Sequence, residues 1–452
     1  MSERLDDART VALQAIIEGT EKLLAEGSPV RRMAVGWRGG DETCDVIGDQ
    51  ILAECGVSAA AEPADLDLFI ATQIYAGGGH TAVIGDFVRA SDSVRAEVIV
   101  TGTVERDIHK GDPPAEIVER LGIGADGLSV CPHEQRAAAT RWLIEQIGAR
   151  RPRRVFLFHH PQDAVAIAGA RPSLCGELYL VHHADRQATL GLHQRGTQIV
   201  DLSPFTGAFT QRVLGLKPVY APLIIGDPGE PPPREINPPF TTVSSGSAHK
   251  FGEEYAENIA RVLETTGGRH IHIGFLKEKR LGNIRAHLEG RGIDAGRFEY
   301  IAWVPSLAGA LIELGADLCI SSAPLGGART AIESGAAGVP MLAHLPDFST
   351  TFGVNHVMPK SLPVWRTIGE LVETLKQIDA AWIIERGRES RRYFETHHHP
   401  DQLRSALADL ENSMLPEVAE LPITELIDLP DAESQLSGDW GFLRSELALF
   451  GR

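Results

Sequence analysis

The amino-acid sequence predicts an α/β protein of two domains, each built on a parallel sheet. From about residue 66, short β-rich runs alternate with helix-like segments, which is the pattern of parallel strands joined by helices. Residues 222–239 contain seven prolines, interrupt this alternation and indicate a linker. The length of 452 residues is enough for two or three domains of about 150 residues each.

The predicted elements follow one another in five stretches. Two amphipathic helices, over residues 5–26 and after Gly39-Gly40, form an N-terminal helical extension. We expect the domains and segments to divide as 1–62 (helical extension), 63–222 (first domain), 223–239 (linker), 240–410 (second domain) and 411–452 (acidic, proline-punctuated segment). The predicted strands are 66–71, 97–101, 154–158, 177–181 and 197–201 in the first domain, and 240–244, 270–274, 298–303, 318–321 and 339–343 in the second.

The composition excludes several classes of protein. There are 43 Lys+Arg against 61 Asp+Glu, a net charge of -18, so a general affinity for nucleic acid or an anionic membrane is not expected. No run approaches the ~18 apolar residues of a spanning helix, and the charged amino terminus lacks the apolar core of a signal peptide. Five cysteines without C-x-x-C spacing indicate neither disulfides nor a thiolate metal site. We expect a cytoplasmic protein; the sequence leaves open whether it forms a homo-oligomer.

Residues 318–344 carry the clearest chemical signal. A predicted strand runs into Gly326-Gly327 and a helix begins there. Glycines let the backbone approach an anion, and a helix amino terminus directs unpaired N–H groups at it. Thr330 adds a hydroxyl donor for a diphosphate, and Glu333, three residues on, suits ribose hydroxyls. The alternative is a glycine-rich turn that binds no ligand.

This segment resembles the nucleotide-binding signature of GT-B glycosyltransferases, and its Gly-Gly-x-x-Thr followed by x-x-Glu most resembles the O-GlcNAc transferase family. The resemblance covers residues 240–345 and, more loosely, the first half. It implies a GT-B fold of two Rossmann-like domains facing a central cleft, a UDP-sugar bound mainly by the second domain, no metal or other cofactor, and inverting transfer. The family's His-Thr pair is replaced here by Ala328 and Arg329, so donor contacts, Arg329 included, must differ in detail.

Two further segments resemble donor-binding parts of the same family. Residues 241–250 end a strand in a small-residue loop with Ser245 and Gly246, and Lys250 matches the lysine that contacts the donor diphosphate. A fixed ammonium there would stabilise the charge of the leaving group, which makes Lys250 a catalytic candidate; the alternative is a surface lysine. Trp303 and Val304 fall where the family binds uracil, and a core tryptophan is the alternative.

Residues 66–90 form a strand, a triple-glycine loop and a helix. They resemble the loop that opens the acceptor domain of the lipid-linked peptidoglycan N-acetylglucosaminyl transferase. Gly78, Gly79, His80 and Thr81 are therefore expected to line the acceptor pocket, with the His80 imidazole as general base. The alternative is a histidine that caps its own helix or is hydrogen-bonded in a turn.

Two histidine pairs follow predicted strands, at the sheet edge where open α/β sheets bind ligands. We expect His159, His182, His183 and Asp185 to line the acceptor or sugar pocket. Metal ligation is the alternative, but adjacent histidines on an extended segment point to opposite faces, so we expect no metal site.

These expectations together predict a hexosyl- or N-acetylhexosaminyltransferase that moves a sugar from a nucleotide sugar to the hydroxyl or other nucleophile of an unidentified glycan, protein or small molecule. Retaining enzymes resembling glycogen synthase carry two glutamates eight positions apart in this region. Glu333 matches the second, but Leu325 occupies the first position, which favours inversion. Two alternatives stay open: a non-catalytic nucleotide-sugar-binding regulator or partner subunit, and a sugar-nucleotide epimerase of the same fold.

Overall fold

The computed structural model describes residues 2–25, 36–57, 62–75, 79–103, 115–183, 187–212, 214–233, 235–346 and 354–415. The chain forms two compact units. The amino-terminal unit comprises residues 1–221 and 404–452, and the carboxyl-terminal unit comprises residues 222–403. Each unit has its own parallel sheet with helices on both faces, so the predicted α/β class is confirmed.

The sheet of the amino-terminal unit has its strands in the order β3-β2-β1-β4-β5-β6-β7, and every pairing is parallel. The strands are β1 (Ala64–Ala71), β2 (Arg95–Val100), β3 (Leu128–Val130), β4 (Pro152–Phe158), β5 (Glu177–His182), β6 (Gln198–Asp201) and β7 (Val219–Tyr220). β3 and β7 were not predicted, because strands this short show no periodicity. The order reverses between β1 and β4, which opens a crevice at their carboxyl ends.

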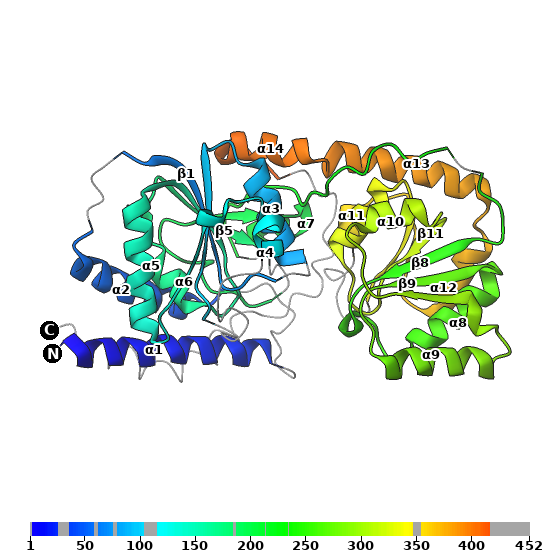
Figure 1. The fold of residues 1–452 in the computed structure, drawn as a ribbon, viewed down its shortest axis with the longest axis horizontal. Helices are drawn as coiled ribbons and strands as arrows, with labels where there is room; N and C mark the ends of the chain where they lie inside the picture. Colours follow the sequence, from blue (N-terminus) through cyan, green and yellow to red (C-terminus); the bar gives the residue numbers. More distant parts are fainter. Residues whose placement is uncertain are drawn as a thin grey trace. The chain divides into compact units, whose positions relative to one another are not determined.

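Two helical layers cover this sheet. One contains α1 (Ser2–Leu24), α2 (Arg38–Cys55), α5 (Arg136–Arg150) and α6 (Ala164–Gly169), and the other contains α3 (Gly79–Ala90) and α4 (Ala115–Leu121), while α7 (Pro204–Arg212) follows β6. Figure 1 shows α2, α5 and α6 on one side of β1 and β5, and α3 and α4 on the other.

The first two helices belong to the core of this unit. Leu13 and Ile16 of α1 and Ile47 of α2 are at most 2% exposed, in one apolar cluster with residues of β1 and β4. Burial of side chains this large is worth about 1.5–3 kcal/mol each. α1 and α2, which the sequence analysis assigned to an N-terminal helical extension, thus pack as one layer of this unit.

The sheet of the carboxyl-terminal unit is also parallel, with the order β10-β9-β8-β11-β12-β13. Its strands are β8 (Thr241–Ser245), β9 (Arg269–Ile273), β10 (Phe298–Ile301), β11 (Leu318–Ile320), β12 (Met341–His344) and β13 (Val364–Trp365). β13 is a two-residue edge strand that the sequence did not predict. Here the order reverses between β8 and β11, which places the crevice at the ends of these two strands.

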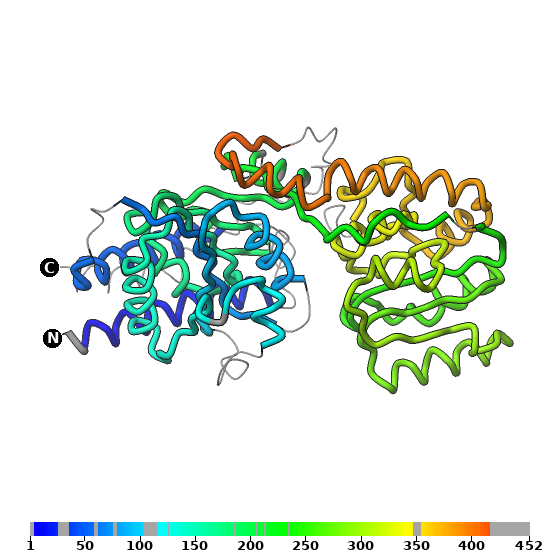
Figure 2. Tube along the Cα trace, turned by 45° about the horizontal axis from the view of Figure 1, so that its top comes forward, coloured from blue at the N-terminus to red at the C-terminus, as the bar shows by residue number. Residues whose placement is uncertain are grey.

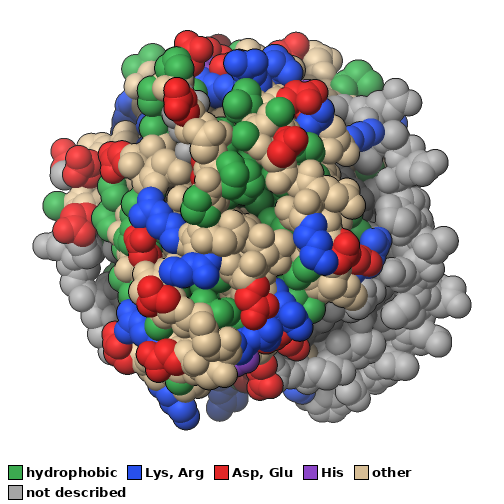
Figure 3. All heavy atoms as spheres, turned by 90° about the vertical axis from the view of Figure 1, so that its right-hand side faces the viewer, with side chains coloured by type: hydrophobic (Ala, Val, Ile, Leu, Met, Phe, Trp, Pro, Cys, Tyr) green, Lys and Arg blue, Asp and Glu red, His purple; other side chains and the backbone are tan. Residues whose placement is uncertain are grey.

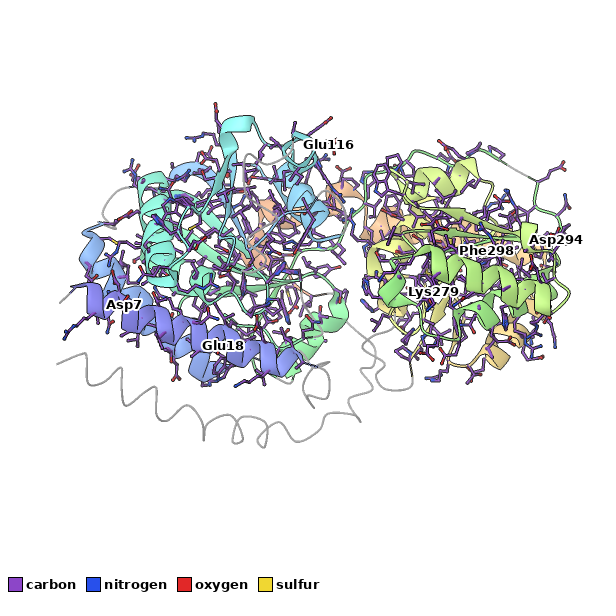
Figure 4. The ribbon with its side chains drawn as sticks, turned by 60° about the horizontal axis from the view of Figure 1, so that its bottom comes forward. Asp7, Glu18, Glu116, Lys279, Asp294 and Phe298 are labelled. Atoms are coloured by element: carbon purple, nitrogen blue, oxygen red, sulfur yellow. The ribbon has the colours of Figure 1, made fainter. Side chains whose placement is uncertain are left out.

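The helices of this unit also form two layers. α8 (Tyr255–Thr266), α9 (Glu278–Gly290) and α12 (Ile368–Lys376) lie on one face of the sheet, and α10 (Leu307–Glu313), α11 (Ala328–Ala336) and α13 (Ala380–His397) on the other (Figure 1). α8 buries Tyr255, Ile259 and Val262 at helical spacing and ends at Gly267, whose φ of 69° few other residues adopt. Figure 4 labels Lys279 in the first turn of α9 and Asp294 beyond its last turn.

The proline-rich segment, predicted as a linker, is bound to the carboxyl-terminal unit. The backbone N–H of Ile225 donates to the carbonyl of His398 over 3.2 Å, and the carboxylate of Asp227 forms an ion pair with Arg391 at 2.8 Å. Both partners lie on or just after α13. This segment is therefore part of the folded unit rather than a free spacer.

After α13, α14 (Pro400–Ala408) and the 3-10 turn Leu410–Asn412 return the chain to the amino-terminal unit. The Arg154 guanidinium donates to the carbonyl of Leu407 over 2.7 Å, and the N–H of Tyr220 donates to the carbonyl of Ser413 over 3.1 Å. Figure 2 shows this orange-red end beside the green trace that contains β7. Of the predicted acidic segment, residues 416–452 lie outside the described residues.

The surface mixes charges of both signs. On the face of the carboxyl-terminal unit in Figure 3, Lys and Arg side chains alternate with Asp and Glu side chains. Among the described helices, none has the length and apolar character needed to cross a bilayer.

A buried carboxylate fixes α2 to the loop after β5. The two carboxylate oxygens of Asp41 accept the backbone N–H groups of Gly191, over 2.6 Å, and His193, over 2.9 Å. Burial raises the pKa of Asp41 to about 7, although these two hydrogen bonds lower it in part. Asp41 thus fixes residues 191–193 of this loop to α2.

We predict that Asp41→Ala destabilises the protein by about 1–3 kcal/mol, because two buried N–H groups lose their acceptor. In the unfolded chain this carboxyl ionises near pH 4, so between about pH 4 and 7 the folded state holds an extra proton. The stability that Asp41 contributes therefore falls as the pH rises through this window. Urea unfolding at pH 5 and pH 8 measures how much free energy of unfolding Asp41→Ala loses relative to the wild type, and the loss should be larger at pH 5. Val46→Ala, at an exposed position on the same helix, is the control. An equal loss of free energy at both pH values would contradict a raised pKa of Asp41.

Candidate functional site

The crevice of the carboxyl-terminal unit is flanked by two loops. One follows β8 and contains Lys250; the other follows β11 and contains Gly327. β8 and β11 are hydrogen-bonded neighbours, with Leu318 paired to Thr242, so both loops leave the sheet at the same edge. The sequence predicted a phosphate site from these loops separately, and the topology brings them together.

The Lys250 ammonium lies directly against Gly327. A Cβ atom built on Gly327 would be 2.9 Å from Nζ of Lys250 and 3.0 Å from Oγ1 of Thr330. Gly327 is the N-cap residue of α11, directly before its first residue Ala328, and no side chain caps the N–H groups there. The absence of a side chain at this position is therefore what admits the lysine to the start of the helix.

Two positive groups meet at this point. The amino terminus of α11 carries a partial positive charge, and its first turn, all of it described, contains no acidic residue. The ammonium of Lys250 adds a full charge to the same place. Two positive groups in one place favour an anion such as a diphosphate.

Backbone contacts hold the two loops together. Phe251 and Pro324 form an isolated antiparallel β-bridge, and the N–H of Gly252 donates to the carbonyl of Ala323 over 2.8 Å. Ser245 is partly buried at the end of β8, and the next residue, Gly246, has a φ of 153° that favours glycine. Ser245 and Gly246 therefore lie at the base of the loop that carries Lys250, as expected.

The other predicted donor residues lie just before α11 or in its first turns. Gly326, Thr330 and Glu333 are all partly buried, and Thr330 lies beside Gly327 in the first turn. The Arg329 guanidinium donates to the carbonyl of Ile224 over 3.1 Å. This bond fixes the proline-rich segment to α11. Arg329, which differs from the family pattern, therefore has a structural role.

Trp303 is exposed, and the alternative of a core tryptophan is wrong. Its exposed fraction is 68%, whereas its neighbour Val304 packs against the core of the unit. The structure adds Phe275, which is 61% exposed. Ile273 and Ile301 are paired in β9 and β10, so Phe275 and Trp303 both stand two residues beyond the same pair. The sequence analysis did not name Phe275 as a candidate site residue. Its position directly after Gly274, at the end of a predicted strand, could have indicated an aromatic side chain at the sheet edge.

In the amino-terminal unit, three histidines gather at the crevice between β1 and β4. The His80 ring, from α3, has its centroid 4.5 Å from that of His183 and 5.6 Å from that of His160. His160 follows β4 and His183 follows β5. The carboxyl ends of neighbouring parallel strands thus supply a cluster of imidazoles.

The first histidine of each pair faces the interior instead. His159 is 2% exposed and bonded through Nε2 to the carbonyl of Leu190 at 3.0 Å, and His182 is 1% exposed with Nδ1 3.0 Å from the Asp201 carboxylate. The prediction that His159 and His182 line an open pocket is therefore wrong. Adjacent residues of an extended chain face opposite sides, and the second member of each pair reaches His80.

The hydrogen bond of His80 determines its tautomer. Its Nε2 lies 2.8 Å from the carbonyl oxygen of Phe158, which only accepts, so Nε2 carries the proton. Nδ1 is then an acceptor, and it is buried without a hydrogen-bond partner among the described residues. The bond runs to β4 and not to its own helix, so the helix-capping alternative is wrong.

Burial and, to a smaller extent, the neighbouring His160 together lower the pKa of His80 to about 4. Burial and His80 likewise hold the pKa of His183 well below its usual range. Both rings are therefore neutral at pH 7. A base of such low pKa is available over a wide pH range but removes protons less readily than a histidine of ordinary pKa.

The remaining predicted pocket residues differ in their surroundings. Thr81 is fully buried, and its Oγ1 accepts the N–H of Tyr75 over 2.8 Å, so it holds the loop and does not line an open pocket. Gly79 is the first residue of α3. Gly78 and Asp185 lie outside the described residues.

Acidic and histidine side chains do not assemble into a metal site in the part of the chain that the structure describes. Asp67, the second member of the sequence Asp65-x-Asp67, is buried and accepts Nε of Arg154 over 2.8 Å. Its carboxylate is thus engaged in an internal ion pair.

No protein-family model and no curated protein matches this chain. Solved structures do resemble it. An O-GlcNAc transferase of Thermobaculum terrenum, in a mutant form, has a TM-score of 0.50 at 15% identity, covering 82% of this chain and 73% of that one. Anabaena HepE, in complex with UDP and glucose, has a TM-score of 0.54 at 13% identity, covering 77% and 99%. The sucrose-phosphate synthase of Thermosynechococcus elongatus has 0.52 at 12% identity, covering 76% and 98%.

These neighbours are GT-B glycosyltransferases, and they share two parallel sheets with flanking helices with this chain. At such identities the likeness concerns the fold, which agrees with the resemblance found in the sequence. The protein therefore has the two-domain α/β architecture of the GT-B fold.

Proposed function

We propose that the protein is a glycosyltransferase that takes its sugar from a UDP-sugar, with inversion and without a metal ion. The observation that carries the proposal is the Lys250 ammonium against Gly327 at the amino terminus of α11. A site of this kind suits the diphosphate of a nucleotide sugar. Two observations on other proteins support the choice of nucleotide: HepE of Anabaena was solved with UDP and with UDP-glucose.

In the proposed donor site, different residues of the carboxyl-terminal unit bind different parts of the UDP-sugar. Lys250 and the first N–H groups of α11 hold the diphosphate, Thr330 adds a hydroxyl donor, and Glu333 binds the ribose. Trp303 and Val304 lie at the position proposed for uracil. When the bond between the anomeric carbon and the diphosphate oxygen breaks, negative charge grows on that oxygen, and the ammonium stabilises it without a metal ion.

The acceptor is assigned to the histidine cluster of the amino-terminal unit. The acceptor hydroxyl attacks the anomeric carbon as the diphosphate leaves from the opposite face, and its proton passes to Nδ1 of His80. The fixed Nε2 proton of His80 leaves Nδ1 as the only acceptor of that ring. The products are the glycosylated acceptor, with its anomeric configuration inverted, and UDP.

Incubation of the protein with a panel of nucleotide sugars, with and without cell extract as acceptor source, tests the proposal. A transferase releases nucleoside diphosphate, faster when acceptor is present and equally well with EDTA. Interconversion of the sugar without such release would indicate an epimerase of this fold, and binding without any turnover would indicate a regulator.

We predict that Lys250→Ala lowers turnover at least 10²-fold, since an ammonium that stabilises developing charge in a transition state is worth about 3 kcal/mol or more. The fold should be unchanged, because Lys250 is only partly buried. Steady-state release of UDP measures the effect. Lys279→Ala, at an exposed position in the first turn of α9, is the matched control and should keep wild-type turnover (Figure 4). Wild-type turnover of the Lys250 variant would overturn the donor site.

We predict that His80→Ala binds UDP normally but transfers ~10²-fold or more slowly, with a residual rate that rises at high pH as the acceptor ionises. In the wild type the base must be unprotonated, and its pKa is lowered to about 4. The rate should therefore stay level as the pH falls through 6.5 and decline only near pH 4. The exposed His133→Ala is the control. A His80 variant with wild-type rate at saturating acceptor would make this residue purely structural.

A further inference from the structure

Arg280, on α9, binds three backbone carbonyls of the loop that carries Lys250. Its Nη1 donates to the carbonyl of Ala248 over 2.9 Å, and its Nη2 donates to those of Phe251 and Gly252 over 2.8 and 2.6 Å. Ala248 lies before Lys250 in the chain, and the other two lie after it. One guanidinium therefore holds the backbone on both sides of the lysine.

An aromatic cluster supports this guanidinium. Its central carbon lies 5.8 Å from the centroid of the Tyr255 ring, which is itself 4.2 Å from the ring of Phe251. The hydroxyl of Tyr255 is 2.7 Å from Nδ1 of the fully buried His272 at the end of β9. Arg280 thus joins the Lys250 loop to a rigid part of the core.

The three carbonyl bonds matter for the position of Lys250. A guanidinium presents its N–H donors in a rigid planar fork, so one side chain holds the backbone on both sides of the lysine in a fixed arrangement. A lysine side chain is also long and flexible, so its ammonium keeps a fixed place only if its own backbone is fixed.

We propose that Arg280 is a positioning residue for the donor diphosphate. It fixes the backbone of residues 248–252 and so sets the Lys250 ammonium against Gly327. The inference rests on the proposed function, since it concerns the same donor site. Arg280 itself acts through Lys250 and does not touch the diphosphate.

Three variants separate this role from a general effect on the fold. Arg280→Gln removes the charge and the forked donor, whereas Arg280→Lys keeps the charge but replaces the two donor nitrogens of the fork by a single nitrogen. Arg285→Gln, at an exposed position on the same helix, is the matched control. Thermal unfolding of each variant shows whether the fold is retained, and Arg280→Lys serves if Arg280→Gln does not fold.

The decisive test is a double-mutant cycle of Arg280→Gln and Lys250→Ala, with UDP affinity by calorimetry and kcat/KM for the donor as readouts. We expect Arg280→Gln to lower both at least tenfold in the wild-type background and less than twofold in the Lys250→Ala background. Arg280→Lys should recover part of the loss, and Arg285→Gln should cost nothing.

The outcomes distinguish the inference from the proposed function. If Lys250→Ala leaves UDP affinity and turnover unchanged, the donor site itself is wrong and the inference falls with it. If Lys250→Ala weakens both but Arg280→Gln has no effect, or has the same effect in both backgrounds, only the positioning role of Arg280 is overturned.

Discussion

The contact between the Lys250 ammonium and Gly327 is the interaction on which the proposed donor site depends. It places a full positive charge at the positive end of helix α11, at the ends of β8 and β11, where the strand order reverses. Open α/β sheets bind ligands at such a reversal, and two positive groups in one place favour an anion. The proposed diphosphate site rests on this electrostatic arrangement.

The surrounding structure serves to keep these groups in place. The Phe251 bridge to Pro324 and the carbonyl contacts of Arg280 fix one loop, and the start of α11 fixes the other. In the amino-terminal unit the same topology, with its reversal between β1 and β4, gathers a second set of side chains around His80. In both units the candidate site residues thus lie at the carboxyl edge of a parallel sheet. The carboxyl-terminal unit has the cationic Lys250 loop there, and the amino-terminal unit has the neutral imidazoles around His80.

The sequence predicted those parts of the molecule whose signal is local. The alternation of strands and helices predicted the two parallel sheets, and the glycines before α11 predicted the turn from β11 into this helix. Contacts between distant segments carried no such signal. The sequence analysis did not single out Arg280, and only the packing of α9 shows that this residue reaches the Lys250 loop. The choice between His159 and His160 depended on the register of β4, which the sequence did not determine. Likewise, the spacing of the first two helices showed that they were amphipathic but not which core they would join.

We propose above that the crevice between β8 and β11 binds a diphosphate through Lys250 and the start of α11. Calorimetric affinities of the wild-type protein for uridine, UMP and UDP, measured at low and high salt, are the decisive measurement for this site. UDP should bind at least tenfold more tightly than UMP and far more tightly than uridine, and the preference for UDP should shrink as salt screens the charges. Equal affinities for the three compounds, or a preference for UDP that is insensitive to salt, would contradict it.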